Sequence, residues 1–184
     1  MEGPINTLLW LTEPVRPWCL SVFCERETTF EQFYSYTLTK RLRWPKLPAK
    51  MLAWLLSVLE PPLLHSAGAI PVYRNGVSIM QTYRKTLQAL RKGENIIIFP
   101  DVNYTDMSST VGELYDGYLL LHRLYLKETG KALPFVPIAV DRKRRRIISG
   151  KAVFFDGMGN FASQMKRTSE QIVRSLQELA DVTK

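Results

Sequence analysis

Cysteine and histidine are scarce in this sequence. The 184 residues include two cysteines, Cys19 and Cys24, and two histidines, His65 and His122. Two cysteines are too few for a disulfide framework, which points to a reducing compartment. A zinc site built mainly on thiolates is also excluded, because neither histidine is near the cysteines in the sequence. We interpret the cysteines as small apolar packing residues and the histidines as structural or surface residues.

Long apolar runs and a secretory leader are also missing. A membrane span requires about 18–20 apolar residues. The most apolar window, Met51–Leu59, has half that length and is followed by Glu60 and two prolines. The opening residues lack a basic stretch, and Glu2 and Glu13 flank their apolar run. The sequence therefore predicts neither a secretory signal nor a membrane-crossing segment.

Positive charge is in excess. Lys and Arg number 25 against 17 Asp and Glu, which gives a net charge of +8. Such a surplus favours an anionic partner, such as nucleic acid, a phosphorylated metabolite or the headgroups of an acidic bilayer. Basic residues form one run from Arg142 to Arg146 and a second cluster that is interleaved with Trp44 and Trp54, namely Lys40, Arg41, Arg43, Lys46 and Lys50.

The second cluster borders the apolar window and allows two interpretations. Aromatic and basic residues beside an apolar segment are typical of a helix that lies at the surface of an acidic membrane. Alternatively, a helix over 49–59 packs into the core and the basic residues are merely solvated. Nucleic acid is a further alternative partner, although the sequence contains no recognisable helix-turn-helix, RNA-binding strand motif or zinc finger.

Hydrophobic periodicity predicts strands that alternate with helices. Strands are expected over 16–23, 70–74, 95–99, 135–140, 147–148 and 152–155, and helices over 28–40, 49–59, 78–92, 112–128 and 161–181. Capping-box spacing at Thr28–Glu31 opens the first of these helices, and Pro61 and Pro62 stop the second. Length and composition favour one domain over 1–184. The order of elements predicts an α/β fold with a largely parallel central sheet flanked by helices.

Two charged residues stand at the ends of neighbouring predicted strands. Arg74 ends the strand over 70–74, and Asp101 follows the strand over 95–99. Ligands of open α/β sheets bind beyond the carboxyl ends of the strands. A guanidinium can hold a phosphate through two hydrogen bonds, and a carboxylate can accept from a hydroxyl. The pair therefore suits an anionic, hydroxyl-bearing substrate, and an ordinary surface ion pair is the alternative.

Three segments together resemble a known family. Gly68–Arg74 reads GAIPVYR, Ile96–Asp101 reads IIIFPD, and Leu133–Val140 reads LPFVPIAV. In order and spacing they are similar to sequence blocks of the glycerolipid acyltransferases of the lysophosphatidic-acid acyltransferase type. Tyr115–Gly117 stands where that family has a K-x-G before a helix. The resemblance covers nearly the whole chain and implies a glycerol-3-phosphate acyltransferase-like fold.

The resemblance also implies an activity. These enzymes of phospholipid biosynthesis transfer a fatty acyl group from acyl-CoA or acyl-carrier protein to a hydroxyl of a lysophospholipid or a glycerol phosphate. The resemblance implies no resident cofactor or metal and no specific nucleic-acid partner. It also implies a peripheral position on the cytoplasmic, inner face of an acidic membrane. Arg74 would contact the anion, while Asp101, Asn103 and Tyr104 would contact the acceptor. Tyr104 stands where the family has a phosphate-contacting arginine, and Val102 replaces a glycine, which leaves the acceptor head group open.

The catalytic HxxxxD motif of this family is incomplete here. Its histidine removes the proton of the acceptor hydroxyl, and its aspartate orients the imidazole. His65 precedes Ile70 and His122 precedes Lys127 at this spacing, so neither histidine fits. The resemblance puts Glu2 in the acid position, so that the base would fall before the first residue. Either the chain starts late or it is a truncated, inactive relative, and in both cases we expect little transferase activity. The non-catalytic alternative is a lipid- or phosphate-binding module.

Overall fold

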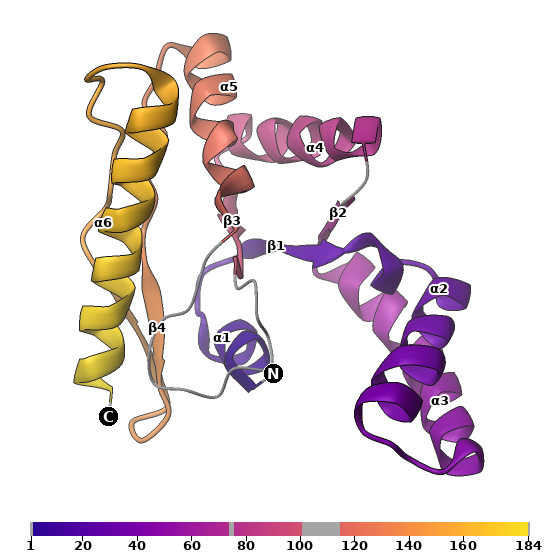
Figure 1. The fold of residues 1–184 in the computed structure, drawn as a ribbon. Helices are drawn as coiled ribbons and strands as arrows, with labels where there is room; N and C mark the ends of the chain where they lie inside the picture. Colours follow the sequence, from indigo (N-terminus) through magenta and orange to yellow (C-terminus); the bar gives the residue numbers. More distant parts are fainter. Residues whose placement is uncertain (1, 74–75, 101–114, 184) are drawn as a thin grey trace. The chain divides into compact units, whose positions relative to one another are not determined.

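The computed structural model describes residues 2–73, 76–100 and 115–183. Contacts divide the chain into two compact units, one formed by Pro14–Ile98 and the other by Met1–Glu13 together with Phe99–Lys184. The architecture is mixed α/β with a three-stranded parallel sheet flanked by helices (Figure 1). This confirms the predicted fold class in its coarse form, while the single domain over 1–184 stays a prediction.

The parallel sheet belongs to the unit Pro14–Ile98. Its strands follow the order β2-β1-β3 and are β1 (Val15–Leu20), β2 (Ile70–Val72) and β3 (Asn95–Ile97). Trp18 of β1 pairs with Ile70 of β2, and Pro17 of β1 pairs with Ile97 of β3. The second half of β1 thus pairs with β2, and the first half pairs with β3. The strands predicted over 16–23, 70–74 and 95–99 are confirmed, although each is shorter than predicted.

Helix α4 (Ile79–Arg91) makes the connection from β2 to β3, which gives the predicted crossover between parallel strands. The chain leaves this helix through Gly93, whose φ of +78° favours glycine. Met80, near the start of this helix, is half exposed. Two threonines, Thr82 and Thr86, are instead fully buried there, because their hydroxyls find hydrogen-bond partners in the interior.

A helical hairpin precedes β2 in the same unit. It consists of α2 (Arg26–Glu31), a π-helical continuation η2 (Gln32–Arg41), and α3 (Lys46–Ser66), and α3 packs against both α2 and η2. The predicted capping box is wrong, since the helix already begins at Arg26 with Glu25 in the N-cap position. Thr28 does not cap a helix, because its hydroxyl donates to the carbonyl oxygens of Val22 at 2.8 Å and Glu25 at 3.2 Å.

Helix α3 continues through the two prolines that were predicted to stop it. Pro61 and Pro62 have no N–H for the carbonyls one turn earlier, which normally disfavours a helix interior. The helix nevertheless runs to Ser66, and Pro61 continues a row of buried small residues, of which Ala49 and Ala53 pack with Leu38 of η2. The row consists of Ala49, Ala53, Ser57 and Pro61. At the other end, Pro48 lies in the first turn, where no N–H is needed.

The second unit combines helices with a two-stranded antiparallel sheet. Its elements are α1 (Glu2–Trp10), the 3₁₀ turn η4 (Asp116–Leu119), α5 (Leu120–Thr129), β4 (Ile138–Asp141), β5 (Arg146–Ser149) and α6 (Phe161–Val182). The strand predicted over 135–140 pairs antiparallel with β5 instead of extending the parallel sheet. A short basic turn joins β4 directly to β5, and such a turn can only return the chain antiparallel. The predicted strand over 152–155 is reduced to a single bridge, Phe135 to Val153.

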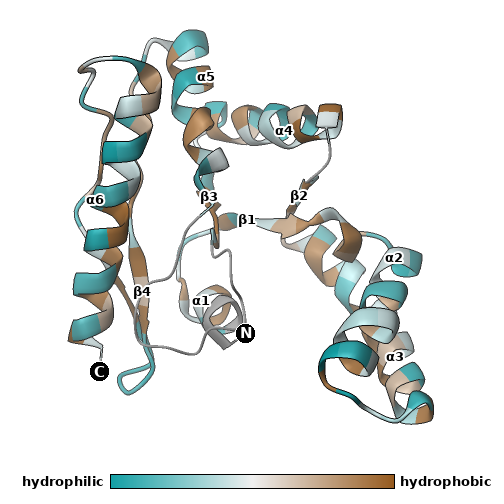
Figure 2. Ribbon diagram, in the orientation of Figure 1, coloured by the Kyte–Doolittle hydropathy of each residue, from teal (hydrophilic) through white to brown (hydrophobic). Residues whose placement is uncertain are grey.

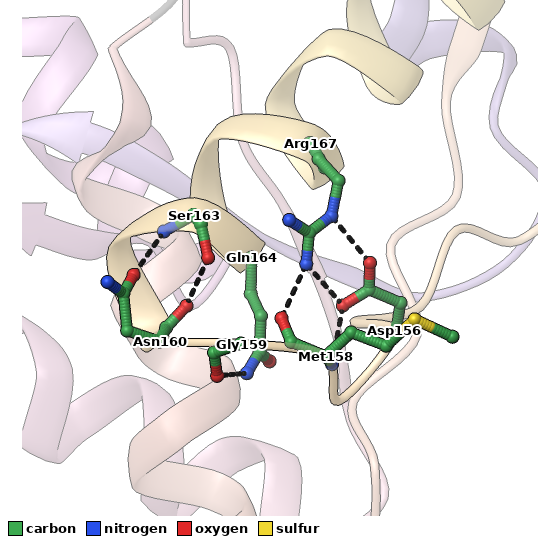
Figure 3. Close-up of polar contacts among 7 residues, drawn as sticks. All are labelled: Asp156, Met158, Gly159, Asn160, Ser163, Gln164 and Arg167. Atoms are coloured by element: carbon green, nitrogen blue, oxygen red, sulfur yellow. Dashed lines mark hydrogen bonds and ion pairs between the residues drawn. The ribbon is translucent and has the colours of Figure 1, made fainter.

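Polar contacts fix the chain where it enters α6. Both carboxylate oxygens of Asp156 accept hydrogen bonds from Arg167, at 2.6 and 3.0 Å, and Arg167 also donates to the carbonyl oxygen of Met158 (Figure 3). The guanidinium lowers the pKa of Asp156 to about 2. Asn160 accepts from the backbone N–H of Ser163 at 2.8 Å and so caps the helix. The helix predicted over 161–181 is confirmed to within one residue.

Candidate functional site

The carboxyl edge of the parallel sheet is where the sequence placed a binding site. Because β1, β2 and β3 are parallel, they all end at this edge. Arg74 comes two residues after the end of β2, and Asp101 comes four residues after the end of β3. Arg74, Asp101, Asn103 and Tyr104 lie outside the described residues, so their convergence on one site stays a prediction.

Two buried threonines of α4 fix the end of β2. The hydroxyl of Thr82 donates to the carbonyl of Pro71 at 2.8 Å and accepts from the backbone N–H of Tyr73 at 3.2 Å. The hydroxyl of Thr86 donates to the Thr82 carbonyl at 2.8 Å and accepts from the indole N–H of Trp18 at 3.0 Å. The last residue before Arg74 is thereby tied to the helix. This link between α4 and β2 was not predicted, although two threonines four residues apart on an otherwise apolar helix face were a visible signal in the sequence.

The first residue of the GAIPVYR segment has a local reason to be glycine. Gly68 has a φ of +63°, and a Cβ placed on it would lie 3.1 Å from Nε of Arg16. That Arg16 donates to the Gly68 carbonyl at 2.7 Å and forms an ion pair with Glu94 at 3.0 Å. The contacts join the starts of β1, β2 and β3. They therefore stabilise the sheet at the edge opposite to the predicted site.

The other candidate residues have separate structural settings. Glu2 begins α1, which packs against β4 and β5, and its side chain lies outside what the structure describes. His122 is buried in α5, stacks on Phe155 at 4.2 Å between ring centres, and accepts from the backbone N–H of Leu133. Burial lowers the pKa of His122. His65 is exposed at the end of α3, with Nε2 at 3.1 Å from the Cys24 carbonyl. These settings agree with structural roles for both histidines.

The two cysteines are free, half-buried thiols. The Sγ atom of Cys24 donates to the Leu20 carbonyl at 3.9 Å, and the interaction between the two thiols raises the pKa of Cys19 and lowers the pKa of Cys24. The nearby carboxyl of Glu60 on α3 has one buried oxygen without a hydrogen-bond partner, and burial raises its pKa to about 7. The sequence interpretation of the cysteines as small apolar packing residues did not include an interaction between the two thiols.

One face of α3 is apolar and exposed. It carries large side chains at helical spacing, which we call the α3 apolar surface: Leu47, Met51, Trp54, Leu55, Leu59 and Leu63. Leu47 is 74% exposed, Met51 68% and Leu63 67%. Figure 2 shows the apolar character of α3 along the hairpin. By length and composition, α3 is long and apolar enough to cross a membrane. This was not predicted, because the helix was expected to stop at Pro61 and Pro62.

Basic residues adjoin the start of this surface. All five members of the second basic cluster are exposed, and they lie at the end of η2, in the connection and in the first turns of α3: Lys40, Arg41, Arg43, Lys46 and Lys50. From Gln32 to Leu59 the chain contains no Asp or Glu. The structure combines parts of both interpretations, because Ala49, Ala53 and the half-buried Leu52 pack into the core, whereas the α3 apolar surface and the basic residues are exposed.

The second unit contains an open groove of about 640 Å³ between α6 and residues 149–154. Gly150 lies at its edge, where a Cβ would come within 2.6 Å of the Ser175 hydroxyl. The groove residues that the structure describes include none of the predicted site residues. Among residues 2–73, 76–100 and 115–183, no three His, Cys, Asp or Glu side chains are grouped to hold a metal ion.

Comparisons with known proteins found no relative. No family model matches the chain, and no match was found among curated proteins or solved structures.

Proposed function

We propose that the chain is a glycerolipid acyltransferase-type domain with a glycerol-3-phosphate acyltransferase-like fold. Its substrates are an acyl-CoA or acyl-carrier protein and a lysophospholipid- or glycerol-phosphate-type acceptor. One observation carries the proposal: β2 and β3 are parallel strands that end at the same edge of one sheet, directly before the segments with Arg74 and Asp101. That is the place where an open α/β sheet binds its ligand.

Each candidate residue has a role in this proposal. The Arg74 guanidinium holds the anionic group of the acceptor, and Asp101, Asn103 and Tyr104 form hydrogen bonds with its polar head. The acceptor hydroxyl attacks the thioester carbonyl, so that a C–O bond forms and the C–S bond breaks. Its proton passes to a base and from there to the departing thiolate. Glu2 would orient that base.

The 184 residues contain no histidine five positions before a carboxylate. We therefore propose that this chain binds both substrates and turns them over slowly or not at all. The α3 apolar surface supports a lipid substrate, because large exposed apolar patches in proteins mark contacts with apolar partners. The tie between Thr82 and the end of β2 supports a site at this edge, since it holds the strand end in place.

Binding measurements on the chain as it stands test the proposal. The chain is titrated with a non-hydrolysable acyl-CoA thioether, with a short-chain lysophosphatidic acid below its critical micelle concentration, and with single-stranded and duplex nucleic acid at physiological salt. We expect saturable binding of the thioether and the lysolipid and no specific binding of nucleic acid. Binding of nucleic acid without binding of either lipid ligand would replace the proposal with a nucleic-acid-binding function.

A further inference from the structure

The two faces of α3 have opposite characters at a fixed spacing. Each buried small residue follows an exposed large one by two positions, which is about 200° around the helix. The pairs are Leu47 and Ala49, Met51 and Ala53, Leu55 and Ser57, and Leu59 and Pro61. The small face is covered by α2 and η2. Among the residues of this unit that the structure describes, none covers the large face, because its side chains are exposed.

The charge beside this face indicates what covers it. The exposed cations Lys40, Arg41, Arg43, Lys46 and Lys50 adjoin an apolar strip that extends from Leu47 to Leu63, about 24 Å along the helix. No Asp or Glu occurs from Gln32 to Leu59. A partner that fits this side of the helix presents hydrocarbon to the apolar strip and anionic groups to the adjoining cations. An acidic bilayer has both features. Trp54 on the strip and Trp44 beside it are half exposed and suit the boundary between headgroups and acyl chains.

The hairpin also indicates how the helix meets the bilayer. A spanning α3 would carry its partners α2 and η2 into the hydrocarbon. These partners have exposed charges, among them Arg26, Glu27 and Glu31, whose burial in hydrocarbon is costly. If α3 instead lies along the surface, its apolar strip enters the boundary region while α2 and η2 stay in water.

We propose that the α3 apolar surface and the adjoining basic cluster form a membrane-docking surface, on which the chain lies flat against an acidic leaflet without crossing it. The occupant is a bilayer that contains acidic phospholipid. The inference does not require acyl transfer, since docking is measured without acyl donor or acceptor. Its failure therefore leaves the proposed reaction to be judged by its own test.

Vesicle co-sedimentation tests the docking surface. The chain is mixed with vesicles of phosphatidylcholine alone or with added phosphatidylglycerol, at low and high salt. We expect binding to the acidic vesicles and weak binding to the neutral ones, with a loss of affinity at high salt because salt screens the lysine and arginine charges. Equal binding to both vesicle types, or no binding to either, would overturn the proposal.

Variants locate the surface. The triple variant Leu47→Ser, Met51→Ser, Leu55→Ser is expected to bind acidic vesicles at least tenfold more weakly, because three side chains no longer enter the acyl region. The matched control removes exposed apolar side chains elsewhere, Val77→Ser with Met158→Ser, and should bind as the unaltered chain does. Lys46→Gln with Lys50→Gln gives an independent test that should weaken binding about tenfold. Equal effects of the control and the triple variant would contradict the assignment.

Depth-dependent quenching tests the flat orientation. Fluorescence is recorded on acidic vesicles whose lipids carry bromine near the headgroup or near the bilayer centre, and the signal of the Trp54→Phe variant is subtracted. We expect Trp54 to be quenched more by bromine near the headgroup. Stronger quenching from the bilayer centre would show a spanning helix and overturn the proposal.

Sedimentation of the chain without lipid tests for a second copy as the occupant. A dimer that the triple variant abolishes would identify that second copy as the occupant and overturn the proposal.

Discussion

Arg74→Ala is expected to weaken the binding of short-chain lysophosphatidic acid by about 10- to 100-fold. A hydrogen bond between charged groups contributes about 1.5–3 kcal/mol, and each 1.4 kcal/mol corresponds to about tenfold in affinity. The affinity of Arg74→Lys should lie between those of the unaltered chain and Arg74→Ala. Lysine keeps the positive charge but lacks the planar guanidinium that forms two parallel hydrogen bonds. Isothermal titration of the three proteins measures the difference.

The matched control for this prediction is Arg84→Ala. Arg84 is exposed on α4, so its replacement removes the same charge from the same unit without touching the strand end. It should change the affinity by less than about twofold, since Arg84 is exposed and dissolved salt screens the charge of an exposed side chain. Equal losses in Arg74→Ala and Arg84→Ala would mean that the lysolipid responds only to net charge, and the assigned role of Arg74 would be wrong.

Leu121→Ala should lower the free energy of unfolding by about 2–5 kcal/mol, because it deletes buried methyl groups and leaves a cavity. Leu121 in α5 is 2% exposed, next to the His122 ring that stacks on Phe155. The control Leu126→Ala changes the same residue type on the same helix at a position that is 43% exposed. It should cost less than about 1 kcal/mol. Urea denaturation followed by circular dichroism compares them, and similar losses would contradict the burial assigned to Leu121.

The ends of α4 and α5 and the start of α6 agree with the sequence prediction, and each is marked by a local signal. Gly93 and Gly130 adopt positive φ at the ends of α4 and α5, and Asn160 caps α6. In these places the residue that ends or begins a helix acts through its own backbone preference or side chain, so that sequence alone is sufficient.

The errors arose where other contacts outweighed a local sequence signal. Pro61 interrupts the helical hydrogen bonds but is buried in the row of small residues against α2 and η2, and α3 continues past it. Thr28 has capping-box spacing, yet its hydroxyl bonds to carbonyls of the preceding turn. The course of α3 depends on segments that pack from elsewhere in the chain, whereas Thr28 bonds to carbonyls three and six residues before it.

Parts of the candidate site were also predicted from the sequence, and other parts were not. The sequence predicted a basic and aromatic margin beside Met51–Leu59, and the structure extends this to an exposed apolar face along all of α3. Its opposite, small-residue face was not predicted, because the partner helices were not known. The residues at the sheet edge remain sequence predictions, with Thr82 as their nearest described support.

In the proposed function, the acyltransferase site lacks the base of the HxxxxD motif. An added N-terminal segment, histidine followed by three neutral residues before Met1, places an imidazole five positions before Glu2. The matched control has alanine in place of that histidine. The decisive measurement is the initial rate of CoA release from acyl-CoA in the presence of lysophosphatidic acid. A general base contributes about 10²–10⁴-fold, so we predict that the histidine form exceeds the alanine form and the unaltered chain by at least about 100-fold. Equal rates in the two extended forms, or rapid turnover by the unaltered chain, would contradict the account.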